Sequence, residues 1–312
     1  MSILYLVVPC YNEEEVLPET SARLTARLDE LIGSGRCSGA SRILFVDDGS
    51  TDKTWSLICS YHERYERVCG LKLAHNRGHQ NALLAGLMTA REYCDVCISL
   101  DADLQDDIGV LDKFLDEYHK GFDVVYGVRS ARKSDSFFKK SSARSFYRLM
   151  RFLGADVVYD HADYRLMSRR ALDALSEHRE VNLFLRGLVP AIGFPSTIVY
   201  YERAQRMAGE SKYPLRKMLA FAFDGITSFS VRPLRIITAL GVVVSILSVA
   251  ALLYALVSKI VGAQPGWTAI VGSIWLIGGI QLFSLGIIGE YIGKIYSETK
   301  ARPKYVVEEF LK

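Results

Sequence analysis

Glycine-rich phosphate-binding patterns are missing from this 312-residue sequence, although it contains 24 glycines. No G-x-G-x-x-G fingerprint follows the first strand-like segment, and no G-x-x-x-x-G-K-[ST] pattern occurs anywhere. The first pattern is typical of dinucleotide-binding oxidoreductases and the second of P-loop ATPases, so both classes are disfavoured. A nucleotide bound by this chain would need a different way of holding its phosphate groups.

Charged residues are absent from two long segments near the C-terminus. Residues 236–258 and 260–289 contain no Asp, Glu, Lys or Arg, and Lys259 separates them. A helix of 23 residues is about 34 Å long, whereas the hydrocarbon core of a bilayer is about 30 Å thick. The sequence therefore predicts two transmembrane helices, at about 236–258 and 267–290, joined by a short turn. The alternative is a helical hairpin buried in a soluble core.

Basic residues flank these two segments and predict their orientation. They are Arg232 and Arg235 before the first segment, and Lys294, Lys300, Arg302 and Lys304 after the second. Because cytoplasmic loops carry an excess of Lys and Arg, we expect both ends of the chain and the large N-terminal domain in the cytoplasm. No cleavable signal sequence is expected, and the six cysteines are predicted to be free thiols in a reducing compartment.

The first 130 residues alternate between short apolar segments and amphipathic segments of helical length. Strands are predicted at 3–9, 42–47, 68–74, 96–100 and 123–127, with helices near 14–32, 52–65, 79–92 and 108–119. This alternation is typical of an α/β fold with a doubly wound parallel sheet. Such sheets bind ligands beyond the carboxyl ends of their strands, and polar clusters follow several of the predicted strands.

Polar side chains follow the first two predicted strands. The first strand runs into Val8-Pro9-Cys10-Tyr11-Asn12-Glu13-Glu14, in which Tyr11 and Glu13 can hold a base and a ribose. Asn12 is predicted to cap the helix that follows. The second strand ends in Asp47-Asp48-Gly49-Ser50-Thr51-Asp52, and one of its two leading carboxylates is predicted to accept a hydrogen bond from the base.

Four acidic residues lie close together after the fourth predicted strand, in Leu100-Asp101-Ala102-Asp103-Leu104-Gln105-Asp106-Asp107. Carboxylates this close repel one another, so a bound cation is their natural partner. Alternate residues of an extended chain point the same way, which would bring Asp101, Asp103 and Gln105 to one ion. Few, hard oxygen ligands suit Mg²⁺ or Mn²⁺ bridging a diphosphate. The alternative, a solvated acidic turn, is disfavoured because the cluster directly follows a buried strand.

Together these motifs resemble family 2 glycosyltransferases, which have the GT-A fold and invert the configuration of the transferred sugar. The shared motifs are Val8–Glu14, Asp47–Asp52, Asn76-x-Gly78 and Asp101–Asp106. Within that family the chain is similar to the dolichyl-phosphate mannose synthase and bactoprenol glucosyltransferase branch. The motifs of this branch are Gly127-x-Arg129, Asp163–Arg169, Asn182-Leu183-Phe184, Gly209–Tyr213, Thr227–Ser230, Gly289–Gly293 and Arg302–Tyr305. Asp107 departs from the family, which usually has proline there, and only a local loop change is expected.

The resemblance implies roles for individual residues. Nucleotide-sugar binding is assigned to Pro9, Tyr11, Glu13, Asp48, Asp101, Ala102, Arg129, Arg206 and Lys212. Asp103 and Gln105 would hold Mg²⁺ or Mn²⁺, and Asp103 and Asp163 are the predicted catalytic residues. Asp163 matches the position usually proposed as a base. A phosphate monoester has a second pKa of about 6, so its acceptor oxygen is largely ionised at neutral pH. We therefore expect Asp163 to orient its neighbours more than to remove a proton.

A basic helix is predicted to bring this domain to the membrane. Lys140, Arg144, Arg148 and Arg151 fall on one helical stripe, as in helices that lie on anionic lipid near the acceptor phosphate. The alternative is a helix packed on the sheet with a solvated basic face. The predicted organisation is a catalytic domain over 1–213, interfacial helices over 214–235, two transmembrane helices over 236–292 and a cytoplasmic tail over 293–312. Glycines in the second span permit close helix contact and predict a homo-oligomer.

Three other functions are weighed against this one. A processive polysaccharide synthase needs a Gln/Arg-x-x-Arg-Trp motif, but no tryptophan lies between Trp55 and Trp267. A non-catalytic scaffold that only binds nucleotide-sugar would have lost some site residues, and all are present. A nucleic-acid binder would interleave aromatic residues with the basic stripe, so no nucleic acid is expected. The resemblance predicts glucose transfer from UDP-glucose to undecaprenyl phosphate. The alternative donors are another UDP-hexose or GDP-mannose, and the alternative acceptor is dolichyl phosphate.

Overall fold

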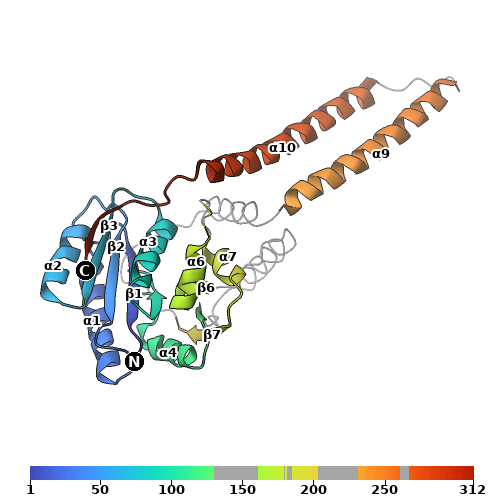
Figure 1. The fold of residues 1–312 in the computed structure, drawn as a ribbon. Coiled ribbons are helices and arrows are strands. Elements are labelled where there is room, and N and C mark those ends of the chain that lie inside the picture. Colours follow the sequence, from blue (N-terminus) through green and yellow to red (C-terminus); the bar gives the residue numbers. More distant parts are fainter. Residues whose placement is uncertain (130–160, 179, 181–184, 203–230, 261–266) are drawn as a thin grey trace. The chain divides into compact units, whose positions relative to one another are not determined.

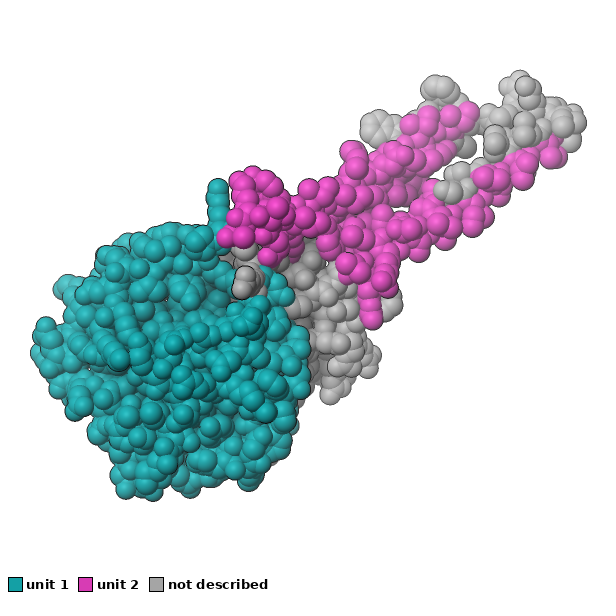
Figure 2. All heavy atoms as spheres, in the orientation of Figure 1, with its two compact units in different colours: residues 1–143, 157–213, 302–312 teal, residues 144–156, 214–301 magenta. Residues whose placement is uncertain are grey.

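The computed structural model describes residues 1–129, 161–178, 180, 185–202, 231–260 and 267–312. The chain divides into two compact units (Figure 2). The sheet unit lies within residues 1–143, 157–213 and 302–312, and the helical unit within 144–156 and 214–301. The predicted basic helix and residues 214–230 of the predicted interfacial helices lie outside the described residues.

An eight-stranded mixed sheet forms the centre of the sheet unit (Figure 1). Its strands in spatial order are β7 (Ser196–Tyr201), β5 (Val124–Arg129), β6 (His161–Ser168), β4 (Val96–Ser99), β1 (Leu4–Cys10), β2 (Arg42–Asp47), β3 (Val68–Leu73) and β8 (Val307–Leu311). The neighbours β4, β1, β2 and β3 are parallel, as predicted. β5 runs in the same direction but is separated from β4 by the antiparallel β6. The five predicted strands are therefore confirmed.

Helices cover both faces of this sheet, which confirms the doubly wound arrangement. α1 (Leu17–Gly33), α2 (Thr54–Arg64) and α4 (Leu111–His119), the last preceded by the short η1 (Ile108–Val110), pack on one face. α3 (His79–Arg91), α6 (Arg169–Ser176) and α7 (Leu185–Ala191) pack on the other. In β1, Leu4, Leu6 and Val8 belong to the first apolar core, whereas Tyr5 and Val7 belong to the second. Such burial on both sides is why the strand reads as a continuous apolar run.

A glycine permits close contact between α3 and the sheet. A Cβ atom at Gly86 would lie 2.5 Å from Val7 Cγ1 and 2.6 Å from Val46 Cγ2, closer than carbon atoms approach one another. α3 follows β3 and runs back across the sheet, so its first residue, His79, lies at the edge where the parallel strands end. The contact at Gly86 therefore helps to fix His79 at that edge.

Three strands were not predicted. β6 carries Asp163 and Arg165, whose charges interrupt the apolar pattern of a buried strand, and β7 is an edge strand with alternating exposure. β8 contains two glutamates and pairs with β3 at the opposite edge. It lies within residues 293–312, the predicted cytoplasmic tail. Residues 293–300 instead continue the preceding helix, and residues 302–312 belong to the sheet unit.

The helical unit contains two long helices, α9 (Arg232–Ile260) and α10 (Trp267–Lys300). Within the described residues, one segment, Leu276–Lys300, is long and apolar enough to cross a membrane, and none of it is buried inside the protein. Large apolar side chains are exposed along both helices, among them Leu247 and Leu282. This exposure disfavours a hairpin buried in a soluble core. The segment Leu276–Lys300 overlaps the second predicted span, 267–290, whereas the first predicted span, 236–258 in α9, stays a prediction.

Candidate functional site

The described site residues lie at the carboxyl edge of the sheet, where its parallel strands end. β1, β2 and β4 are parallel, so the segments after Cys10, Asp47 and Ser99 leave the sheet at one edge. β5 ends at the same edge in Arg129, and β6 runs in the opposite direction, which places Asp163 near its start there as well. The topology therefore brings together groups that are far apart in the sequence, at the edge where sheets of this kind bind ligands.

Asp48 organises the loop that leads into α3. Its carboxylate accepts hydrogen bonds from the backbone N–H groups of Arg77 at 2.7 Å and Gly78 at 2.8 Å. Gly49 follows with φ of 67°, and a Cβ atom there would lie 2.6 Å from the backbone nitrogen of Asn76. Glycine suits both the left-handed conformation and this close approach. Asp48 is thus placed in the site, and its predicted hydrogen bond to a base stays a prediction.

The segment after β1 is tied to the segment after β2. Asn12 adopts a positive φ of 54°, and its side chain accepts a hydrogen bond from the backbone N–H of Thr51 at 2.9 Å. α1 begins only at Leu17, with Val16 as its N-cap. The prediction that Asn12 caps this helix is therefore wrong, because its side chain joins two loops instead. The neighbouring Tyr11 ring is 46% exposed, so it is accessible for stacking on a base.

The acidic segment after β4 turns back rather than continuing as an extended chain. Leu104 has a positive φ of 46°, and its N–H donates to the Asp101 carbonyl at 3.4 Å. The Asp103 carboxylate accepts a hydrogen bond from the backbone N–H of Gln105 at 3.2 Å. The argument from alternating side chains is therefore wrong for Asp101, Asp103 and Gln105, because these residues are not in a strand. Their predicted roles as metal and nucleotide ligands stay predictions.

The oxygen atoms of this turn fit a hard divalent cation. Within the described part of the chain, no cluster of three or more His, Cys, Asp or Glu side chains is arranged to hold a metal by itself. Asp103 and Gln105 offer two oxygen donors, and Mg²⁺ is commonly held by one or two carboxylates together with substrate phosphates and water. Beside them, Asp106 Oδ2 is buried and accepts no hydrogen bond from the described residues. This donor set suits Mg²⁺ or Mn²⁺ bound together with a nucleotide.

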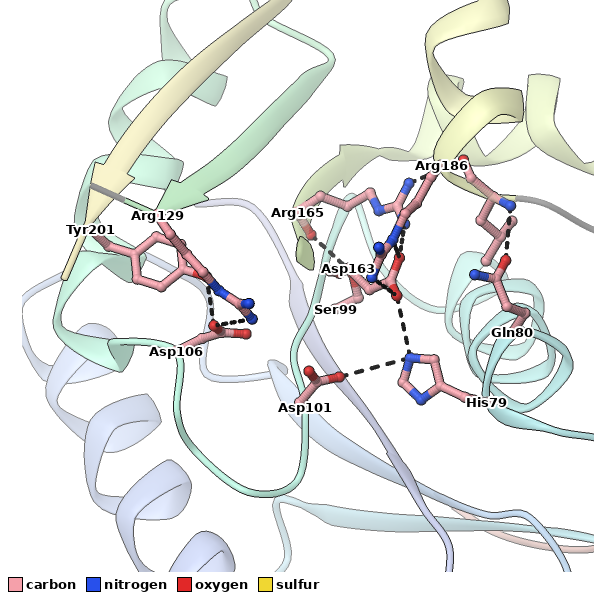
Figure 3. Close-up of polar contacts among 11 residues, drawn as sticks. His79, Gln80, Ser99, Asp101, Asp106, Arg129, Asp163, Arg165, Arg186 and Tyr201 are labelled. Atoms are coloured by element: carbon pink, nitrogen blue, oxygen red, sulfur yellow. Dashed lines mark hydrogen bonds and ion pairs between the residues drawn. The ribbon is translucent and has the colours of Figure 1, made fainter. Parts of the chain in front are cut away.

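Asp106 connects this turn to β5 and β7 (Figure 3). Its Oδ1 accepts a hydrogen bond from the Tyr201 hydroxyl at 2.5 Å and lies 3.3 Å from Arg129 Nη2. Arg129 Nε also donates to the Tyr201 hydroxyl oxygen at 3.1 Å. Burial, followed by the charge of Asp106, raises the pKa of Tyr201 above its ordinary value, so the phenol stays protonated. The arrangement holds the Arg129 guanidinium against Asp106, which follows the predicted metal ligand Gln105 in the sequence.

Replacing Tyr201 with phenylalanine is expected to destabilise the sheet unit by about 1–3 kcal/mol, because the buried Asp106 carboxylate would lose a hydroxyl donor. Thermal or denaturant unfolding of the protein purified in detergent measures this change. Tyr200→Phe is a matched control, since that neighbouring ring is 64% exposed and its hydroxyl group should contribute little. Equal losses in the two variants would contradict the expectation.

Asp163 is the centre of a second group of contacts in Figure 3. Its Oδ1 lies 2.6 Å from Arg165 Nη2, and its Oδ2 lies 3.2 Å from Arg186 Nη2. His79 Nε2 lies 3.5 Å from Asp163 Oδ2 and 3.7 Å from Asp101 Oδ1. Although burial by itself raises the pKa of Asp163, the hydrogen bond from His79 and the charges of the two arginines hold it well below the usual range. A carboxylate that is ionised this firmly is a weak base.

Asp101 lies between these two groups of contacts (Figure 3). Burial raises the pKa of Asp101 to about 6, an effect that His79 opposes and that the carboxylates of Asp106, Asp163 and Asp103 reinforce. A cation or a hydrogen-bond donor placed here would favour the ionised form. The raised pKa of Asp101 would therefore fall on binding a cation or a hydrogen-bond donor. This is consistent with the prediction that Asp101 faces the nucleotide.

The remaining predicted site residues fall into two sets. Pro9 is buried at the end of β1, and Ala102 is buried in the acidic turn, where its carbonyl accepts a hydrogen bond from the Thr20 hydroxyl at 2.6 Å. Glu13 donates its backbone N–H to the Thr54 hydroxyl oxygen at 2.9 Å. Six others lie outside the described residues: Lys140, Arg144, Arg148, Arg151, Arg206 and Lys212.

Four residues of the observed site had no predicted role. His79 directly follows the Asn76-x-Gly78 motif, and Arg186 lies two residues after Asn182-Leu183-Phe184, so nearby motifs pointed to both. Asp106 belongs to the acidic motif itself. Tyr201 has no such signal, because only the pairing of β7 with β5 brings it to Arg129.

Known proteins were compared with the whole chain. The family model described as glycosyl transferase family 2 matches residues 5–176, more than half of the chain. The chain belongs to glycosyl transferase family 2. This confirms the family predicted from the motifs, and the mixed α/β sheet is of the GT-A type expected for it. A second family model, the GtrB C-terminal hairpin, matches residues 232–295, which include α9 and most of α10.

Relatives of this family 2 glycosyltransferase match it over nearly its full length. The glycosyltransferase YkoT of Bacillus subtilis (strain 168) is 55% identical over 98% of this chain and 91% of its own. The bactoprenol glucosyl transferase of Shigella phage SfV is 36% identical over 97% of both chains. Among solved structures, glucosyl-3-phosphoglycerate synthase from Mycobacterium tuberculosis has a TM-score of 0.46 at 17% identity, covering 74% of this chain and 78% of that one.

Proposed function

We propose that the protein transfers glucose from UDP-glucose to undecaprenyl phosphate at the cytoplasmic face of a membrane. The observation that carries this proposal is the full-length similarity to a bactoprenol glucosyl transferase, 36% identical over 97% of the chain. The similarity includes both the family 2 region and the C-terminal hairpin. The acidic turn, Arg129 and Asp163, gathered at the ligand-binding edge of the sheet, support it.

The donor would be held by residues at the ends of four strands, β1, β2, β4 and β5. Tyr11 and Glu13, after β1, would contact the base and the ribose, and Asp48, after β2, would accept a hydrogen bond from the base. Asp103 and Gln105 would hold Mg²⁺ or Mn²⁺, which supplies positive charge to the leaving diphosphate. Arg129 adds a cation beside this turn, and its fixed position reduces the reorganisation needed during reaction. Arg206 and Lys212 are proposed as further phosphate contacts.

The reaction itself would be an in-line displacement. An oxygen of the acceptor phosphate attacks the anomeric carbon, the bond between that carbon and the UDP oxygen breaks, and the configuration inverts. An acceptor with a second pKa of about 6 is already mostly dianionic at neutral pH. No strong base is then required, which agrees with the low pKa of Asp163. Positioning of the two substrates and stabilisation of the leaving group would supply most of the rate enhancement.

The return of the chain to the sheet supports two membrane crossings. β8 pairs with β3, so residues 302–312, which follow the helical unit, belong to the same sheet unit as residues 157–213, which precede it. A chain with both ends on one side of a bilayer crosses it an even number of times, so a spanning α10 needs a second crossing. α9 has 29 residues, about 44 Å, which is long enough. The basic flanks favour the cytoplasm for both ends, and the glycines of α10 support a homo-oligomer.

A transfer assay tests this function. Protein purified in detergent is incubated with undecaprenyl phosphate, Mg²⁺ or Mn²⁺, and one of several radiolabelled donors, including UDP-glucose, other UDP-hexoses and GDP-mannose. We expect label in the organic phase with UDP-glucose and its loss on addition of EDTA. If only a different donor gives lipid label, the proposed type of reaction stands, and that donor takes the place of UDP-glucose in the proposal. No lipid label from any donor, despite metal-dependent nucleotide binding, would overturn the proposal in favour of a non-catalytic nucleotide-sugar-binding protein.

A further inference from the structure

The acidic turn after β4 holds its backbone in a conformation that leucine rarely adopts. Leu104 has a φ of 46°, in the left-handed region where a residue with a Cβ atom is strained. Such a conformation persists only when the surrounding contacts over-determine it. The Leu104 side chain, 5% exposed, belongs to the first apolar core and supplies one such contact. A second contact, at Ala102, is polar.

Thr20 supplies this polar contact. It lies near the start of α1 and is fully buried, and its hydroxyl group donates to the Ala102 carbonyl at 2.6 Å, although the two residues are 82 positions apart. The hydroxyl oxygen also lies 3.1 Å from the Val16 carbonyl, but that carbonyl already accepts the backbone N–H of Thr20. A hydroxyl group has one hydrogen, so the shorter contact assigns it to Ala102.

This hydrogen bond acts on the peptide unit that leads into Asp103. The turn buries Ala102 and Leu104, whereas Asp101 and Asp103 are only half-buried. A peptide unit is planar, so the Ala102 carbonyl oxygen and the Asp103 Cα atom lie in one rigid plane. Holding the carbonyl oxygen therefore restricts the direction in which the Asp103 side chain leaves the backbone.

The segment beyond the turn has supports of its own. Arg27, also on α1, donates to the carbonyls of Ile108 at 3.3 Å and Gly109 at 3.2 Å. These contacts hold η1, further along the chain than Asp103. Loss of the Thr20 hydroxyl group should therefore loosen the turn and leave η1 in place.

We propose that Thr20 is a positioning residue for the divalent cation, because its hydroxyl group holds the acidic turn in the arrangement in which Asp103 and Gln105 bind Mg²⁺ or Mn²⁺. This inference rests on the proposed metal-dependent transfer. If only a fraction of the molecules has the turn in this arrangement, the apparent affinity for the cation falls by that fraction. A saturating concentration of the cation then restores the arrangement. The signature is a higher cation requirement with an unchanged maximal rate.

Replacing Thr20 with valine tests this signature, since valine keeps the shape of the side chain and removes the hydroxyl group. Calorimetry of the full-length protein in detergent gives the Mn²⁺ concentration at half-maximal UDP binding. We expect this concentration to rise about three- to tenfold, as for the loss of one hydrogen bond. The Mn²⁺ concentration at half-maximal transfer should rise by the same factor, and kcat at saturating Mn²⁺ should stay within about twofold of wild type. Thr20→Ser keeps the hydroxyl group and should bind Mn²⁺ nearly as the wild type does.

Two control variants separate this effect from a general loss of stability. Thr25 lies on the same helix, and its buried hydroxyl oxygen has no hydrogen-bond partner among the described residues, so Thr25→Val should leave the Mn²⁺ requirement unchanged. Ser41→Ala removes the hydroxyl oxygen that accepts the Leu4 N–H at 3.0 Å, at the opposite edge of the sheet. It should lower the thermal unfolding midpoint without raising the Mn²⁺ requirement. Thr20→Ala lacks the same hydroxyl group and replaces Thr20→Val if that variant does not fold.

Hydrogen exchange of the backbone over residues 101–107 reports on the turn without any ligand. Exchange should be faster in Thr20→Val than in wild type and unchanged in Thr25→Val, because only the first variant loses a contact with the turn. Equal exchange in wild type and Thr20→Val would show that the hydroxyl group does not hold the turn.

The outcomes distinguish the role of Thr20 from the proposed reaction. If the wild type binds UDP with Mn²⁺ but transfers no sugar, and Thr20→Val needs more Mn²⁺ for UDP binding, the reaction fails and the role of Thr20 stands. If the wild type transfers sugar and Thr20→Val has an unchanged Mn²⁺ requirement, the reaction stands and the role of Thr20 is overturned, even where the variant is less stable. Equal rises in Thr25→Val or Ser41→Ala would overturn it as well.

Discussion

Replacing Asp163 with asparagine will lower the free energy of unfolding by about 3–5 kcal/mol at neutral pH. Asparagine has nearly the same shape as aspartate but no charge, so Arg165, whose side chain is 1% exposed, would remain as an uncompensated buried cation. The thermal unfolding midpoint of the protein in detergent measures this loss. Transfer will decrease as well, because Arg186 and His79 lose their contacts with this carboxylate at the ligand-binding edge of the sheet.

The dependence of this effect on pH distinguishes a positioning residue from a base. The pKa of Asp163 in the folded protein lies well below the ordinary value of about 3.9. Its contribution to stability is therefore complete above about pH 4–5 and is lost as the pH falls through the folded pKa. The difference in stability between wild type and Asp163→Asn should decrease in acid as Asp163 is protonated, and should also decrease as the pH rises through the raised pKa of His79, because the neutral imidazole no longer attracts Asp163.

The rate of transfer gives the complementary test. The acceptor itself titrates near pH 6, so a rise in rate through that pH should persist in Asp163→Asn. A rise near neutrality that is present in the wild type and absent from the variant would show instead that Asp163 removes a proton. Asp173→Asn on α6 is the matched control, because this carboxylate lies 3.7 Å from Arg91 and is 60% exposed. Its loss of stability should not exceed about 1 kcal/mol.

Replacing Asp103 with alanine will decrease the rate of sugar transfer about 10²- to 10³-fold. The variant loses one of the two predicted metal ligands, and with it much of the positive charge that stabilises the leaving diphosphate. Thermal unfolding of the variant shows whether a loss of rate comes from the missing metal ligand or from a loss of stability. Initial rates measure transfer, and calorimetry measures whether Mn²⁺ still strengthens UDP binding. We expect that Mn²⁺ no longer strengthens UDP binding in this variant.

Asp107→Asn is the matched control for this experiment. Asp107 is exposed, and its side chain accepts a hydrogen bond from the Gly109 N–H at 2.8 Å at the start of η1. Asparagine can make the same hydrogen bond, so rate and metal dependence should stay within about twofold of wild type. A normal rate in Asp103→Ala would contradict the metal assignment.

The strands and helices of the first 130 residues were predictable because their patterns are local. Buried parallel strands read as short apolar runs, and amphipathic helices read as periodic ones. β6 was not predicted because Asp163 and Arg165 neutralise each other within the fold, which makes a buried strand look polar in the sequence. β8 was not predicted because the two glutamates of an edge strand face solvent, and its partner β3 lies more than two hundred residues earlier.

Some residues of the candidate site were likewise predictable from local motifs, and others were not. The sequence by itself determined the family and pointed to the acidic cluster after β4, Arg129 and Asp163, because each belongs to a short motif whose chemistry is readable in isolation. Only the tertiary structure decided that Tyr201 fixes Arg129 through Asp106, and that His79 and Arg186 meet at Asp163. These contacts join segments that lie far apart in the sequence. They depend on the register of β5, β6 and β7, and a side chain's partner across a sheet leaves no periodic signal in its own segment.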